Sequence, residues 1–164
     1  MEYQLKPLFM GDVSVVPIEE TLDLTALDVQ GLRPFTQPVR VTGSIRYVDG
    51  VVTLQADVNY RYDGRCDRCA EPFQRPDTLK IKHILVTSLN DESNEDFLLL
   101  KDYRLPLSDL VTADLLLSLP MKSLCREDCR GICPQCGRNL NEGLCGCRQE
   151  TVDPRLAALK DLLN

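Results

Sequence analysis

The stretch that decides the fold class is residues 39–62, with the sequence VRVTGSIRYVDGVVTLQADVNYRY. Apolar and polar residues alternate on both sides of Asp49 and Gly50, and this period of two is typical of strands with one buried face. Asp-Gly accepts the positive φ angles of a type I′ turn. The stretch therefore predicts a β-hairpin. The apolar set of the first strand is Val39, Val41, Ile45 and Tyr47, and that of the second strand is Val52, Leu54, Ala56, Val58 and Tyr60.

Further strand patterns lie on both sides of this hairpin. Residues 13–16 and 22–29 carry weaker strand patterns, and residues 79–86 are rich in β-branched side chains. Residues 88–96 contain four acidic side chains and little apolar content, which predicts a solvated loop. The N-terminal half is thus expected to form an antiparallel β-sheet or partial barrel.

Two helices are predicted after the sheet. Ser108 can cap a helix that runs to Leu119, with Asp109 complementing its dipole and Pro120 marking its end. Residues 153–163 begin with Asp-Pro and place leucines on one side, which predicts a short amphipathic helix. The expected fold class is α+β.

Length and composition limit the possible classes of protein. A chain of 164 residues, 43% hydrophobic and 27% charged, should form one domain or one domain with a small appendage. Its 19 basic and 25 acidic side chains give a net charge of −6, which argues against a surface that binds nucleic acid over its whole extent. No secretory signal pattern or membrane-spanning apolar run is present, so we expect a cytoplasmic protein without a membrane partner.

Eight cysteines carry the main functional signal. In a reducing compartment, paired cysteines indicate metal binding or catalysis more often than disulfides. Four thiolates suit a structural zinc ion, so eight cysteines predict about two Zn²⁺ sites. The cysteines form four closely spaced pairs: Cys66 and Cys69, Cys125 and Cys129, Cys133 and Cys136, Cys145 and Cys147.

Spacing favours one grouping of these pairs. Only eight residues separate Cys136 from Cys145, so the last two pairs close a short, ribbon-like loop at low entropic cost. Cys66 and Cys69 would then share a site with Cys125 and Cys129, and would tie the sheet to the segment after the helix. Other groupings remain open from the sequence. We expect two units, a sheet domain with its packed helix over residues 1–120 and a zinc-ribbon-like, cysteine-rich segment with a C-terminal helix over residues 121–164.

Four other roles for the cysteines compete with zinc binding. The first is that the cysteines are reduced thiols without metal. The second is that Cys66 and Cys69 form a thiol redox pair, since they have its spacing, although a hairpin rather than a βαβ unit precedes them. Cys129, Cys133 and Cys136 have the spacing used by iron–sulfur radical enzymes, but those need a larger barrel scaffold. A cysteine nucleophile needs a base, and the sole histidine, His83, lies in a strand pattern that favours a structural or surface role.

No motif indicates an enzyme or a small-molecule substrate. The acidic side chains of residues 91–96 form no acid–base pair, and no glycine-rich nucleotide loop occurs. Four arginines lie among aromatic residues near Cys66 and are candidates for a local contact with nucleic acid, with exposed arginines beside core aromatics as an equal alternative. They are Arg61, Arg65, Arg68 and Arg75.

The order of these motifs resembles the YceD family, in its cysteine-rich bacterial branch. A hairpin runs into Cys66-Asp-Arg-Cys69-Ala-Glu-Pro-Phe, and an acidic loop and a leucine-rich helix ending in Leu-Pro-Met follow. Then come CREDCRGICPQCG from Cys125, the stretch LNEG, Cys145-Gly-Cys147, and Asp-Pro-Arg-Leu from Asp153. The resemblance spans nearly the whole chain.

This resemblance implies a non-enzymatic factor for accumulation of 23S rRNA and assembly of the large ribosomal subunit. The acidic charge then favours a basic ribosomal protein or an assembly factor of the large-subunit precursor as partner, with at most a local rRNA contact. Two alternatives stay open: a free-standing zinc-ribbon nucleic-acid-binding module and a thiol redox protein.

Overall fold

The computed structural model describes residues 1–29, 31–88 and 97–147. A five-stranded sheet has the strand order β2-β3-β4-β5-β6, and β1 and β7 form a separate two-stranded sheet. The strands are β1 (Glu2–Gln4), β2 (Val15–Leu22), β3 (Val39–Val48), β4 (Val51–Arg65), β5 (Pro72–Val86), β6 (Phe97–Leu99) and β7 (Arg104–Pro106). The helices are α1 (Lys6–Phe9), the 3-10 turn η1 (Lys101–Tyr103) and α2 (Leu107–Ser118).

The predicted hairpin is confirmed. Strands β3 and β4 pair antiparallel up to Val48 and Val51, and the turn between them holds Asp49 at φ 51° and Gly50 at φ 83°. Gly43 lies opposite Ala56, and a Cβ atom at Gly43 would come within 2.5 Å of the Ala56 Cα. The two strands therefore approach each other closely at this point.

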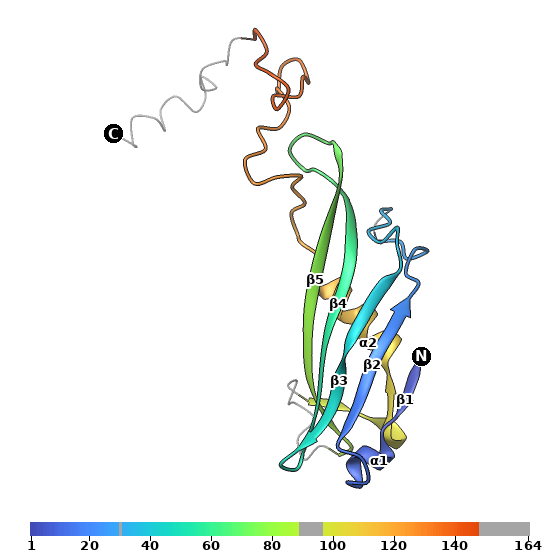
Figure 1. Ribbon diagram of the computed structural model, residues 1–164. Helices are drawn as coiled ribbons and strands as arrows, with labels where there is room; N and C mark the ends of the chain where they lie inside the picture. The colour runs from blue at the N-terminus through green and yellow to red at the C-terminus, as the bar shows by residue number, and fades with distance from the viewer. Residues whose placement is uncertain (30, 89–96, 148–164) are drawn as a thin grey trace, which may run out of the picture.

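Strands β4 and β5 form a second, longer hairpin that projects beyond the rest of the sheet (Figure 1). Each strand has 15 residues, while β3 pairs with β4 only as far as Asn59. The projecting part carries Cys66 and Cys69 at its tip, and the cysteine-rich segment after α2 lies against this tip (Figure 1).

The hydrophobic core lies between one face of the sheet and the short helices. Leu107, Val111 and Leu115 of α2 are fully buried against the apolar face of β3, β4 and β5. Burial of each such side chain stabilises the fold by roughly 1.5–3 kcal/mol. On the same face, His83 Nε2 lies 2.7 Å from Asp114 Oδ2, so this histidine joins β5 to α2 and has the expected structural role.

The structure corrects three details of the sequence prediction. One strand at Val15–Leu22 replaces the two weak patterns, and no regular strand follows it up to residue 29. The sheet is mixed because β6 pairs parallel to β5. Ser108 does not cap α2: the helix begins at Leu107 after Pro106, and the Ser108 hydroxyl donates instead to Asp109 Oδ1 at 3.3 Å.

Two expected features lie outside the described residues, namely most of the acidic loop and the C-terminal helix over residues 153–163. Among the described helices, none has the length and apolar character required to cross a membrane.

Candidate metal centre

The eight cysteines form two clusters of four, in the grouping that the spacing favoured. The first cluster contains Cys66, Cys69, Cys125 and Cys129, and the second contains Cys133, Cys136, Cys145 and Cys147. Within each cluster all four sulfur atoms lie within 4.8 Å of one another.

The sulfur distances in the first cluster suit a tetrahedral metal ion. Cys66 Sγ lies 3.8 Å from Cys129 Sγ, and Cys69 Sγ lies 3.7 Å from Cys125 Sγ. In a tetrahedron with zinc–sulfur bonds of about 2.3 Å, neighbouring sulfurs are about 3.8 Å apart. A disulfide would require about 2.05 Å. The geometry therefore matches four ligands around one ion.

Each cluster contains a tight turn that aims backbone amides at sulfur. In the first, the Ala70 amide donates to the Cys66 carbonyl at 2.8 Å, and in the second the Gly137 amide donates to the Cys133 carbonyl at 2.9 Å. Both turns place the residue after the second cysteine in the left-handed region, at φ 60° for Ala70 and φ 71° for Gly137. Glycine takes this conformation without strain, whereas alanine does not.

The hairpin tip is clamped to the segment after α2 by hydrogen bonds as well as by cysteines. The Asp67 amide donates to the Ser123 carbonyl at 2.8 Å, and the Ser123 amide donates to Asp67 Oδ2 at 2.7 Å. The Tyr62 and Ser123 hydroxyls are 2.7 Å apart. These contacts would hold the two halves of the first cluster in register.

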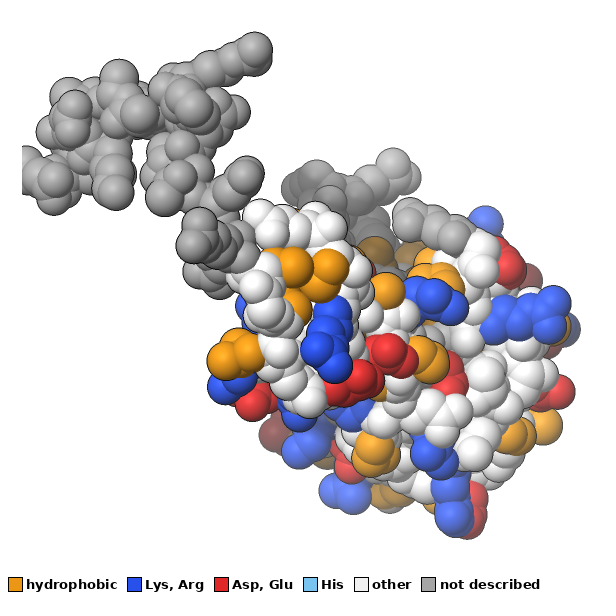
Figure 2. Space-filling view, turned by 90° about the horizontal axis from the view of Figure 1, so that it is seen from above, with side chains coloured by type: hydrophobic (Ala, Val, Ile, Leu, Met, Phe, Trp, Pro, Cys, Tyr) orange, Lys and Arg blue, Asp and Glu red, His pale blue; other side chains and the backbone are white. Residues whose placement is uncertain are grey.

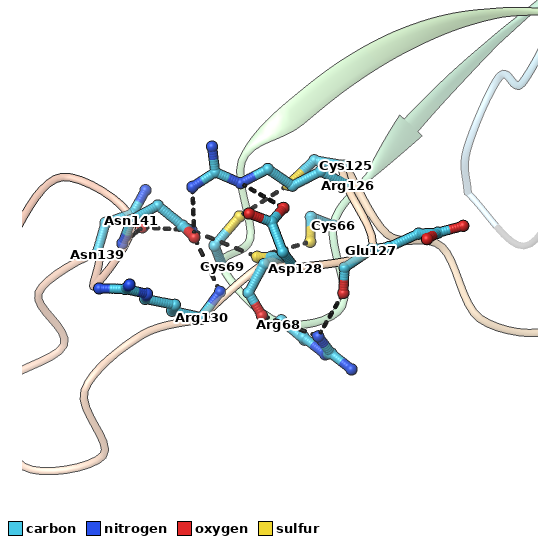
Figure 3. A network of polar contacts seen from close by, with 11 residues as sticks. Cys66, Arg68, Cys69, Cys125, Arg126, Glu127, Asp128, Arg130, Asn139 and Asn141 are labelled. Atoms are coloured by element: carbon cyan, nitrogen blue, oxygen red, sulfur yellow. Dashed lines mark hydrogen bonds and ion pairs between the residues drawn. The ribbon is translucent and has the colours of Figure 1, made fainter.

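Arg68 has a structural role in this clamp. Its guanidinium donates to the carbonyls of Glu127, at 3.2 Å, and Cys129, at 2.9 Å (Figure 3). Its own carbonyl accepts the Ile132 amide at 3.0 Å. A Cβ atom at Gly131 would approach that carbonyl to 2.9 Å, so glycine is required there.

The two clusters differ in exposure. In the first, Cys66, Cys69 and Cys129 are 2–5% exposed and Cys125 is half-buried. In the second, Cys133 is buried, Cys136 is exposed, and Cys145 and Cys147 are half-buried. The first cluster is therefore part of the folded interior, whereas the second lies close to solvent.

Asn141 connects the two clusters, and Figure 3 shows it beside Arg126 and Arg130 at the first of them. It lies in the loop of the second cluster, yet its Nδ2 donates to Cys129 Sγ of the first at 3.3 Å. Its Oδ1 accepts the Arg130 amide and the Arg126 guanidinium, both at 2.8 Å. A single asparagine in the loop of one cluster thus orients a sulfur atom of the other. Residues that donate hydrogen bonds to metal ligands commonly orient them in this way.

Within each cluster the thiols differ in acidity. Burial acts to raise the pKa of the Cys66 thiol, but backbone amides that donate to its sulfur lower that pKa to about 6. Amide donation, foremost from Cys136, also lowers the pKa of Cys133 to about 6. Burial and neighbouring thiols raise the pKa of Cys125 to about 12. The pKa of Cys147 is also raised to about 12, mainly by the Cys136 thiol and next by burial. Four adjacent thiols cannot all ionise unless a cation offsets their repulsion.

The structure does not gather the four candidate arginines into one patch. Arg61 and Arg65 lie on the sheet face turned away from α2, whereas Arg75 pairs in register with Tyr62 and so lies on the opposite face. Arg75 also lies 3.4 Å from Asp77 Oδ2, and Arg68 is bound to carbonyls as described above. From above, basic and acidic side chains are interspersed (Figure 2).

Comparison with known proteins places the chain in a family. The model of the family described as "Large ribosomal RNA subunit accumulation protein YceD" matches residues 54–163, which is more than half of the chain and contains all eight cysteines. The chain belongs to the YceD family. No solved structure matches it.

Relatives of the chain occur in several bacteria. An uncharacterized protein of Mycobacterium tuberculosis and one of Mycobacterium bovis are each 33% identical over 104 residues, which is 61% of this chain and 50% of theirs. The chain therefore spans about half the length of these mycobacterial relatives. The uncharacterized YlbN of Bacillus subtilis is 26% identical over 152 residues, 88% of this chain and 86% of that protein.

Sequence reasoning missed Asn141 and Ser123 as residues of the site. Asn141 follows Asn139 in a polar loop, and nothing in its spacing distinguishes it from a turn residue. Ser123 precedes Cys125 by two positions, which was the one available signal, since residues next to ligands commonly orient them.

Proposed function

We propose that this YceD-family protein is a non-enzymatic, cytoplasmic factor that supports accumulation of 23S rRNA and assembly of the large ribosomal subunit. The family match over residues 54–163 supports the link to large-subunit RNA. The single structural observation behind the mode of action is the pair of four-cysteine clusters, which suits a stapled binding scaffold. On this proposal the protein acts by binding.

We propose zinc as the metal of both clusters. Four thiolates at tetrahedral spacing are the donor set of structural zinc sites, and eight cysteine ligands leave no coordination position for water or substrate. Once bound, each ion would join segments of the chain, the first cluster linking the hairpin tip to residues 125–129. We further propose that residues 1–120 and 121–164 are two units held together by this first site.

We propose the class of partner from the net charge of the chain. The chain has a net charge of −6, and each zinc ion with four thiolates adds a site of charge −2. An acidic protein attracts a basic partner, so we propose a basic ribosomal protein or an assembly factor in the large-subunit precursor. Contact with rRNA would be local.

Depletion of the protein in cells tests this function. We expect a selective fall in the ratio of large-subunit to small-subunit rRNA, with loss of large subunits on a sucrose gradient. Re-expression of the wild-type chain should restore the ratio, which controls for effects of depletion itself. An unchanged ratio would rule out the proposed role.

A thiol redox function is the second candidate, because the pKa of Cys66 is lowered to about 6 and Cys69 completes a Cys-x-x-Cys pair. Alkylation separates the two proposals. Zinc-bound thiolates should react slowly until a chelator removes the metal, whereas a redox pair should react rapidly without chelator.

A further inference from the structure

The outer face of the five-stranded sheet is open. We define the outer face as the alternate residues of β2, β3, β4 and β5 that lie in register with Ser44, Gln55 and Lys82. Helix α2 packs on the opposite face, and Figure 1 shows no described helix in front of the outer one. Its side chains on β3 and β4 are all exposed or half-buried, although these are central strands.

Charge is divided between this face and the remainder of the chain. Six basic side chains lie on the outer face: Arg40, Arg46, Arg61, Arg65, Lys80 and Lys82. Three acidic side chains accompany them, Glu19, Asp57 and Asp63, so the face has a net charge of +3. The remaining 13 basic and 22 acidic side chains of the chain therefore give −9. The acidic composition thus conceals one basic surface.

The outer face contains a shallow depression of about 290 Å³ between β3, β4 and β5. Arg46 and Lys82 flank it, and Ser44, Thr53, Gln55 and Val48 complete its lining. Arg46 Nε donates to Ser44 Oγ at 3.0 Å. In the described part of the chain, neither cation forms an ion pair, whereas Arg40 on the same face lies 2.7 Å from Glu19 Oε1. These two charges are available to an external anion.

We propose that the outer face binds the phosphate backbone of RNA, with Arg46 and Lys82 as phosphate contacts. The lining supplies cations, hydroxyls and an amide, which are the groups that contact phosphate and ribose, and only one aliphatic side chain. No exposed aromatic ring lies in the depression, so recognition is of the backbone and not of base sequence. The inference rests on the proposed function in one respect only, the identity of the RNA that is bound in cells.

Salt-dependent binding of the full chain to a fluorescein-labelled single-stranded RNA of mixed sequence tests this inference. Each phosphate contact to single-stranded RNA contributes about 0.7 to the slope of log affinity against log salt. The double variant R46Q/K82Q should therefore lower the slope by about 1.4, and lower affinity roughly 25-fold at about 0.1 M salt. D57N, which removes an acidic side chain from the same face, should strengthen binding.

The matched control is K6Q/K101Q, which removes the same charge from α1 and η1, away from the outer face. It should leave affinity nearly unchanged, and circular dichroism should confirm that both double variants are folded. Equal losses in the two double variants, or no binding by the wild-type chain at low salt, would overturn the inference. The rRNA ratio after depletion is measured separately, so this failure would leave the proposed function standing.

Discussion

The first cluster should stabilise the sheet far more than the second does. It joins Cys69 to Cys125 and so closes a loop of 57 residues that contains β5, β6, β7 and α2. The second joins Cys136 to Cys145 and closes a loop of only ten residues outside the sheet. In the chain-entropy model of a cross-link, these closures are worth about 4 and about 2.7 kcal/mol, respectively.

The matched variants are Cys69→Ser and Cys136→Ser, each of which removes one ligand from one cluster. Cys69→Ser should lower the free energy of unfolding of the sheet by about 4 kcal/mol, and its Tm by about 8–16 °C. Cys136→Ser should leave that Tm nearly unchanged, because its loop contains no strand of the sheet.

Thermal unfolding of the zinc-loaded chain, followed by far-ultraviolet circular dichroism, measures both values. Zinc content should fall from two ions to one in both variants, which controls for loss of metal as such. Equal shifts in Tm, or an unchanged Tm for Cys69→Ser, would refute the assignment of the first cluster as the long-range staple.

Three further predictions follow from the site and the core. Gly137→Ala should weaken zinc binding about five- to thirtyfold and Ala70→Gly should strengthen it by a similar factor, since both positions have positive φ and the strain of a non-glycine residue there is about 1–2 kcal/mol; competition with a chelator measures both. Asn141→Ala should weaken zinc retention about 10- to 100-fold in the same assay, and an unchanged affinity would remove its orienting role. Burial, with a hydrogen bond to Glu20, raises the pKa of Tyr3 from 10.0 to about 12, so its contribution to stability should be complete below about pH 10 and lost as the pH rises to 12. Tyr3→Phe should reduce this alkaline loss in unfolding experiments, and a loss of unchanged size would exclude Tyr3 as a contributor.

The hairpin and the sulfur grouping were predictable because each depends on local spacing. Asp49 and Gly50 specify their turn without help from the remainder of the chain, and the short separation of Cys136 from Cys145 favours pairing of the last four cysteines. The early start of β5 was not predictable in this way. Pro72 and Pro76 argue against a strand, and are tolerated because this part of β5 pairs only with β4 in the described chain.

Other features depended on tertiary contacts that no local pattern encodes. Arg68 resembled its neighbouring arginines in sequence, but the fold brings the carbonyls of Glu127 and Cys129 to it from about 60 residues away. Ser108 had the sequence of a helix cap, yet the cap position of α2 is Pro106, two residues earlier, because Leu107 is fully buried in the core. Packing of a large apolar side chain outweighs a cap worth about 1 kcal/mol.

Native mass spectrometry of the full chain tests the central claim most directly, namely that two zinc sites, each with four cysteine ligands, staple this YceD-family scaffold. The account predicts two zinc ions per chain, with all eight cysteines reduced and resistant to alkylation until a chelator is added. A metal-free chain with readily alkylated thiols, or one whose cysteines are joined as disulfides, would contradict it.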